Sequence, residues 1–267
     1  MKLTKEDLNL PLEALRLEIK EIADEVRYKF IKKGIIDIFD VLENEAFFIR
    51  KPLESKEVSG FSTYFEGKFI VMLNSNSTLG RERYTGAHEL YHIMCNQDIL
   101  KKEKLIEDSK YQEEDRRADI FAAEFLMPED YVKELFYKLV DIEPNKVEVR
   151  HVVRLNNELK VSYKAMLKRL VQLDLCSIDL YEELASYGTN ENKVKLQEIT
   201  IREGYDISLI TPSKKSYISK EYIEISRKNY EDKKISYTKI TELLEFVNKE
   251  PKDYGYKPDN KEEDDLV

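Results

Sequence analysis

The chain has 267 residues, with 53 acidic and 44 basic side chains and a formal net charge of −9. No run of 18 apolar residues occurs, which excludes a membrane-spanning helix, and the net acidity disfavours a broad nucleic-acid-binding surface. We therefore expect no membrane partner. The only two cysteines, Cys95 and Cys176, offer no disulfide framework, so we expect a cytoplasmic protein. The chain has only 8 glycines and 7 prolines, and this composition favours helix over sheet.

The N-terminal part of the chain predicts two helices and a hairpin. Residues 12–33 have the apolar spacing of an amphipathic helix that ends at Gly34, and residues 35–49 suggest a second helix that runs into a strand. Residues 60–74 predict a β-hairpin, with residues 66–68 at its turn. The edge of this small antiparallel sheet could hold a substrate in extended form, or the hairpin could only cover the core.

The following segment contains the pattern H-E-x-x-H, formed by His88, Glu89 and His92. On a helix the two histidines lie one turn apart on the same face, so both imidazoles can bind one Zn²⁺. Glu89 then lies beside the metal, where its carboxylate can take a proton from a water. Residues 83–97 predict the required helix. Thr85 can cap this helix, although the apolar spacing also allows an earlier start.

A catalytic zinc site needs a third protein ligand and one open position. Residues 113–128 predict another helix, with a charged start, an alanine-rich centre and a proline at its end. Asp115 and Asp119 share one face of this helix with two alanines, which allow close approach to the histidine helix. If Asp115 binds zinc, Asp119 can orient one of the two histidines through a hydrogen bond.

Two further segments follow these helices or connect them. Residues 101–115 are charged and predict a loop or a short solvated helix, with a flap over the site as the less favoured alternative. Residues 147–173 predict two helices about a short turn, with Ser162 as the N-cap of the second helix. Their net positive charge is compatible with a DNA-binding helix-turn-helix, but we favour a helical pair packed on the preceding domain. His151 in this segment and Tyr91 are candidate donors to an oxyanion.

The C-terminal part of the chain has helical patterns but no pattern of a chemical site. Residues 220–228 and 237–248 predict helices, and we expect residues 187–250 to form a helical module that recognises a partner. Residues 251–267 combine many acids with proline and glycine, which predicts a disordered tail.

Two stretches combine these features into longer motifs. Residues 81–92 read RERYTGAHELYH, and residues 118–128 read ADIFAAEFLMP. They resemble R-x-R-[FY]-T-x-A-H-E-x-x-H and A-[ND]-x-F-A-x-x-[LF]-L-M-P, the motifs of the ImmA/IrrE family of zinc metallopeptidases, and weaker likeness extends over residues 15–184. The resemblance implies a gluzincin-like peptidase core followed by a helix-turn-helix-like segment. Family members often cleave a helix-turn-helix repressor and so switch on mobile-element or stress-response genes.

The chain departs from the family pattern at the third zinc ligand. The family has glutamate three residues before the alanine of the second motif, and this chain has Asp115 there. Aspartate is one methylene shorter but still binds zinc. Glu114 is the alternative ligand, although it lies about 100° around the helix and would need a rotated or unwound turn. We favour Asp115, because its spacing allows Asp119 to act on a histidine ligand.

Together these features predict an α+β, mostly helical protein with a small antiparallel sheet. We expect a zinc metallopeptidase domain over residues 1–140 and a helix-turn-helix-like segment over residues 141–186, before the C-terminal module and tail. The predicted function is that of a zinc-dependent endopeptidase that cleaves a helix-turn-helix repressor. The alternative is a zinc-stabilised regulatory module, catalytically weak or inactive, that binds a repressor or DNA without cleavage.

Overall fold

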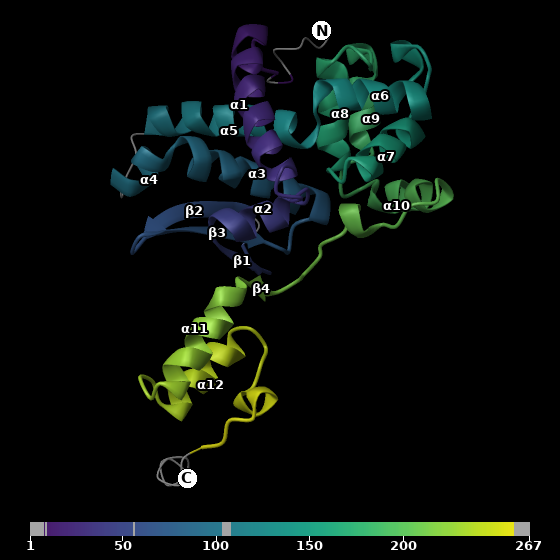
Figure 1. The fold of residues 1–267 in the computed structure, drawn as a ribbon. Coiled ribbons are helices and arrows are strands. Elements are labelled where there is room, and N and C mark those ends of the chain that lie inside the picture. The colour runs from purple at the N-terminus through teal and green to yellow at the C-terminus, as the bar shows by residue number, and fades with distance from the viewer. Residues whose placement is uncertain (1–7, 9, 56, 103–107, 259–267) are drawn as a thin grey trace.

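The computed structural model describes residue 8 and residues 10–55, 57–102 and 108–258. Figure 1 shows helices layered on a small sheet, a group of helices beside them, and a C-terminal helical pair that projects from the sheet. The prediction of a mostly helical α+β protein is confirmed, and no helix in the described part of the chain is long and apolar enough to cross a membrane. The helices are α1 (Glu13–Ile31), α2 (Ile38–Glu45), α3 (Leu79–Cys95), α4 (Gln97–Lys102), α5 (Asp108–Leu126), α6 (Glu129–Leu139), α7 (Val149–Glu158), α8 (Tyr163–Gln172), α9 (Tyr181–Ser186), α10 (Lys193–Arg202), α11 (Lys220–Glu231) and α12 (Tyr237–Glu245).

The sheet is mixed, and its strand order is β2-β3-β1-β4. The predicted hairpin of β2 and β3 is confirmed, and its turn residues Glu66 and Gly67 have positive φ angles of 46° and 88°. The expectation of a purely antiparallel sheet was wrong, because β1 pairs with β3 in parallel. The sheet has β2 at its edge and β3 next to β1. The alternation of residues along a strand does not reveal which strand lies beside it or in which direction that strand runs. The strands are β1 (Phe47–Lys51), β2 (Gly60–Phe65), β3 (Lys68–Asn74) and β4 (Tyr217–Ile218).

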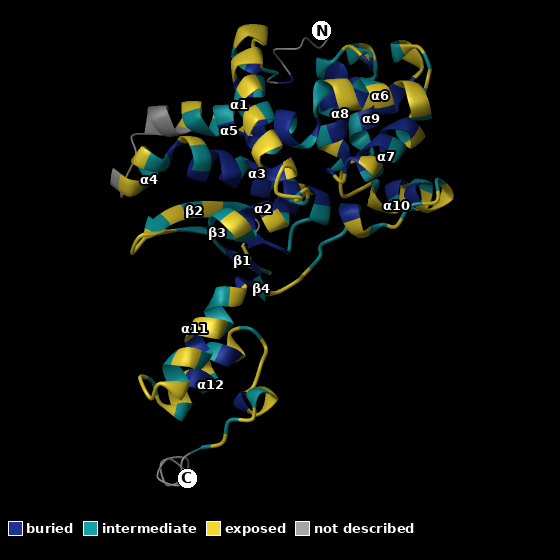
Figure 2. Ribbon diagram, viewed as in Figure 1, coloured by how far each residue is buried: buried dark blue, intermediate teal, exposed yellow. Residues whose placement is uncertain are grey.

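Helix α3 lies between the sheet and the helices α1 and α5 (Figure 1). It packs against α2, β2 and β3 on one side and against α5 on the other. Figure 2 shows that buried residues line the facing surfaces of these layers. Leu90 of α3, Val71 and Leu73 of β3 and Phe121 of α5 are fully buried in this core. Burial of these apolar side chains fixes α3 in the middle of the molecule.

Helix α3 begins earlier than a cap at Thr85 would allow. Its N-cap residue is Thr78, which makes no side-chain cap hydrogen bond. Tertiary contacts hold the first turns instead. The backbone N–H of Leu79 donates to Thr211 O at 3.0 Å, and the buried carboxylate of Glu82 accepts two bonds from Arg50 at 2.7 and 2.9 Å. The earlier start that the apolar spacing allowed is therefore the observed one.

The charged stretch between the two helices of the predicted site is partly helical. Helix α5 already includes residues 108–115, where a loop or a short solvated helix was expected, because lysine, glutamine and glutamate in this stretch are good helix formers. Residues 103–107, the centre of the possible flap, lie outside the described residues.

Helices α6 to α9 form a second apolar core beside α5. The predicted cap of α8 is confirmed, since the Ser162 hydroxyl accepts a hydrogen bond from Ala165 N at 3.2 Å. Arg169 of α8 is fully buried and donates to both carboxylate oxygens of Glu124 on α5 at 2.6 Å. The α7–α8 pair is therefore packed on α5 through both apolar and ionic contacts.

The C-terminal segment returns to the sheet before it forms α11 and α12. Strand β4 pairs with β1 in antiparallel orientation, and the two helices pack on each other beyond it. Residues 251–254 form a turn of 3-10 helix, and Tyr256 packs on Tyr230 with ring centroids 4.8 Å apart. The expectation of disorder was thus wrong for residues 251–258, because buried Pro251 and these aromatic rings give that part a packing surface. Residues 259–267 lie outside the described residues.

Gly80→Ala should lower the free energy of unfolding by about 1–3 kcal/mol. A Cβ atom at position 80 would lie 2.7 Å from Ser162 N and 2.8 Å from the backbone carbon of Val161. Those atoms belong to the α7–α8 turn, so the added methyl group would push α3 away from it. Urea unfolding measures the change, and Gly188→Ala is the matched control because its nearest atoms would lie at 3.4 Å. Equal stability of Gly80→Ala and wild type would contradict this close approach.

Candidate metal centre

Helix α3 presents His88 and His92 on one face, as the i, i+4 spacing requires. Their Nε2 atoms lie 3.3 Å apart. The opposite wall is α5, and small side chains at Ala118 and Ala122, both fully buried, allow the two helices to approach closely. Both imidazoles are thus turned toward one point between α3 and α5.

Asp115 of α5 completes a triangle of ligand atoms. Its Oδ1 atom lies 3.3 Å from His92 Nε2 and 3.7 Å from His88 Nε2. Tetrahedral zinc with ligand distances of about 2.0–2.1 Å keeps its ligand atoms about 3.3–3.4 Å apart, so the triangle has the right size. Asp115 Oδ1 is also buried and accepts no hydrogen bond from the described residues. The group of His88, His92 and Asp115 could therefore hold a metal ion.

Asp119 contacts the first histidine from outside this triangle. Its Oδ1 atom lies 2.9 Å from His88 Nδ1. A proton on Nδ1 that is donated to Asp119 leaves the lone pair of Nε2 free for a metal. The predicted carboxylate–histidine pair is thus formed with His88.

Glu114, the alternative third ligand, points to a different set of partners. Its Oε2 atom accepts hydrogen bonds from Asn96 at 2.7 Å and from the Tyr91 hydroxyl at 3.1 Å. The Asn96 amide nitrogen in turn lies 3.4 Å from His92 Nδ1. Glu114 therefore supports the far side of the His92 ring, and Asp115 is the carboxylate that lies with the two imidazoles.

Glu89 lies beside the triangle in a buried environment, with 6 % of its surface exposed. Burial raises the pKa of its carboxyl, and Asp115 adds to this shift, while the charge of His88 and a hydrogen bond from Ser62 oppose it. A carboxyl with a raised pKa is a better proton acceptor than an ordinary one near neutral pH. Ser62 lies on the edge strand β2, so the sheet helps to orient this side chain.

The two imidazoles have very different proton affinities. Burial lowers the pKa of His88, but the carboxylates of Asp115 and Asp119 outweigh burial and raise that pKa to about 10. Burial and the charge of His88 lower the pKa of His92 to about 4. With this pKa, His88 is an imidazolium at neutral pH when no metal is bound, and a metal would replace the proton on its Nε2 atom.

The two candidate oxyanion donors are engaged by other partners. The Tyr91 hydroxyl donates to Glu114 and accepts a bond from Arg117 Nε at 3.0 Å. His151 caps the N-terminus of α7, where its Nδ1 atom accepts a hydrogen bond from Glu148 N at 3.0 Å. Both interpretations were therefore wrong, because each side chain has a local partner that occupies it.

Two neighbours of the centre were missed in the sequence. Asn96 lies four residues after His92 on the same helix face, and this spacing was a usable signal. Ser62 precedes Glu89 by 27 positions, and only the fold of the hairpin against α3 brings the two together. No local pattern in the sequence could have identified it.

Residues 46–171 match the family model described as Peptidase_M78, IrrE N-terminal-like domain. The match covers both motifs and all residues of the candidate centre, and it agrees with the resemblance to the ImmA/IrrE family. A search of curated proteins found no match. Residues 46–171 are thus similar to a peptidase-family domain, and they contain a residue group that could hold a metal.

Asp119→Ala should weaken zinc binding by about 10- to 100-fold, because His88 would lose the partner that fixes its tautomer and ring orientation. Competition with a chromogenic chelator measures the affinity. Glu113→Ala is the matched control, since Glu113 is an exposed acid on the same helix. An Asp119→Ala variant that binds zinc as tightly as the control would show that Asp119 does not support the ligand.

Proposed function

We propose that the IrrE N-terminal-like domain of this chain is a zinc-dependent endopeptidase, with His88, His92 and Asp115 as metal ligands and Glu89 as general base. The observation that supports this most strongly is the convergence of two imidazole nitrogens and one orphaned carboxylate oxygen within 3.7 Å, beside a buried glutamate. Structural zinc sites normally have four protein ligands, and the group found among the described residues has three. A site of this kind would leave one position for catalysis.

Zinc at this centre would supply a Lewis acid for the substrate carbonyl and a water of lowered pKa. Glu89 would take the proton from the attacking water and return it to the leaving amine. The hydrogen bond from Ser62 would orient the Glu89 carboxylate, and Asp119 would hold His88 with Nε2 toward the ligand position. These groups come from three elements, α3, α5 and β2, so the folded layers would assemble the catalytic arrangement around the motif on α3.

The substrate would be a protein segment in extended conformation. Strand β2 is at the edge of the described sheet, and Ser62 on this strand contacts Glu89. A peptide that pairs with the free edge of β2 would therefore run past the general base. By the resemblance to the ImmA/IrrE family, we propose a helix-turn-helix repressor as the physiological substrate and release of the genes it represses as the result.

Glu89→Gln should retain about one zinc per chain and lose at least about 100-fold of peptidase activity, because the amide cannot accept the proton of the attacking water. Wild type and variant are loaded with zinc, matched for metal content, and incubated with denatured proteins and with a helix-turn-helix repressor from the same genome. Mass spectrometry of new peptide termini measures cleavage.

Glu113→Gln, a change of the same kind at an exposed position, is the control for this experiment. Equal cleavage rates for Glu89→Gln and wild type would disprove the role of Glu89. If zinc-loaded wild type cleaves neither the repressor nor the denatured proteins, the chain is a regulatory module and not an endopeptidase.

A further inference from the structure

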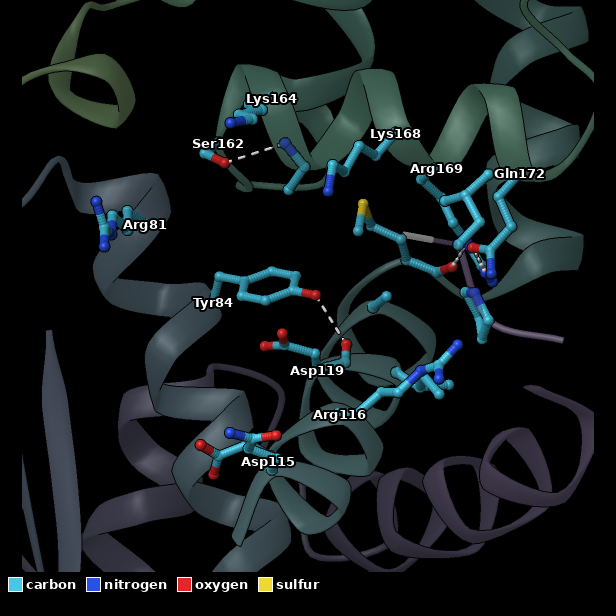
Figure 3. A pocket seen from close by; sticks show the side chains of 17 residues that line it. Arg81, Tyr84, Asp115, Arg116, Asp119, Ser162, Lys164, Lys168, Arg169 and Gln172 are labelled. Carbon is cyan, nitrogen blue, oxygen red and sulfur yellow. Dashed lines mark hydrogen bonds between the residues drawn. The ribbon is translucent and has the colours of Figure 1, made fainter. Parts of the chain in front are cut away.

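A cleft of about 520 Å³ lies between α5 and α8 and reaches the candidate metal centre at Asp115. Its volume is in the range of ordinary ligand sites. Figure 3 shows Asp115 and Asp119 on one wall and Ser162, Lys164 and Lys168 on the other. A substrate bound at the metal centre would therefore have one of its neighbouring segments in this cleft.

The cleft is lined by an excess of cationic side chains in a chain whose net charge is −9. Two acids also line it, but Asp115 and Asp119 face the imidazoles of α3. Four cations of the lining form no ion pair with a carboxylate of the described residues: Arg81 of α3, Arg116 of α5, and Lys164 and Lys168 of α8.

These cations are available to a ligand. Lys164 and Arg116 are exposed and form no ion pair with the described residues. Among the described residues, Arg81 donates to the neutral Ser59 hydroxyl at 2.8 Å and Lys168 to the Leu8 carbonyl at 3.2 Å. Burial and, after it, repulsion from the charge of Lys164 lower the pKa of Lys168, while the charge of Asp119 partly offsets them. A carboxylate in the cleft would relieve this repulsion.

The basic wall of the cleft is held rigidly. Arg169 lies at the inner face of α8, where Glu124 neutralises it, and the apolar face of α8 is buried against α7 and α9. Lys164 and Lys168 both line the cleft between α8 and α5, where Lys168 is half-buried and Lys164 is exposed. The helix-turn-helix-like segment thus serves as a wall of the cleft.

We infer that this cleft selects substrates with an acidic side chain close to the scissile bond, which is attracted by the positive charge of Lys164, Arg116 and Lys168. This inference rests on the proposed peptidase function and names its substrate class. The carboxylate is that of an internal aspartate or glutamate, because an endopeptidase substrate continues on both sides of the cut. A C-terminal carboxylate has the same chemistry, and the experiment separates the two.

Binding of peptide hydroxamates to the zinc-loaded protein tests the inference without catalysis. The probes differ in one side chain, Glu, Gln or Lys, placed in turn at each position near the hydroxamate, and all end in an amide. We expect the Glu probe to bind about 2- to 5-fold more tightly than the Gln probe at one position, as for a partly exposed ion pair. Lys164→Glu and Arg116→Glu should abolish this preference and favour the Lys probe.

Lys195→Glu is the control, because Lys195 is an exposed lysine on α10, away from the cleft. It should bind the probes as wild type does. Equal affinity for Glu, Gln and Lys at every position, or a Glu preference that survives both charge reversals, would overturn the inference and leave the proposed function intact. Tighter binding only of probes with a free C-terminal carboxylate would also overturn it. Failure of every hydroxamate to bind would instead refute the open metal position and, with it, the proposed function.

Discussion

The close packing of α3 against α5 is the constraint on which the candidate centre depends. Ala87, Ala118 and Ala122 are fully buried, and their small side chains let the helix with the two histidines approach the helix with the carboxylate. Asp115 is one methylene shorter than the glutamate of the family pattern, and it still places Oδ1 3.3 Å from His92 Nε2. Larger side chains at the alanine positions would separate the helices and strain a core that is packed at crystal-like density. The short side chain of Asp115 can reach the imidazoles because the small alanines let the two helices pack closely.

A buried ionic cluster connects α5, which contributes to the candidate centre, to the neighbouring helices α8 and α1. Glu124 on α5 binds Arg169 of α8 through two bonds of 2.6 Å and Arg16 of α1 through one of 3.0 Å. Breaking such a buried pair by removal of one partner costs about 3–5 kcal/mol, because the remaining charge stays desolvated. The cluster fixes α8 against α5, and this placement turns a helix-turn-helix-like pair into one side of a cleft. Packing, rather than the motif itself, decides what that pair can contact.

Local patterns in the sequence were sufficient for the parts of the centre that lie on one helix. The i, i+4 spacing gave His88 with His92 and Asp115 with Asp119, and the capping preference of serine gave the start of α8 at Ser162. Contacts between distant segments have no such local signal. The parallel pairing of β1 with β3 and the contact of Ser62 with Glu89 follow from tertiary packing. Tyr91 and His151 were misassigned for the same reason, since their hydrogen-bond partners appear only in the folded chain.

Zinc content of the purified protein, measured by elemental analysis, tests the three-residue centre most directly. We predict about one zinc per chain in wild type and in Glu114→Ala, and much less in Asp115→Ala of unchanged helical content. Zinc retained by Asp115→Ala at the wild-type level would contradict the assignment of the third ligand. No zinc in wild type, even after zinc is added back, would contradict the metal centre as a whole.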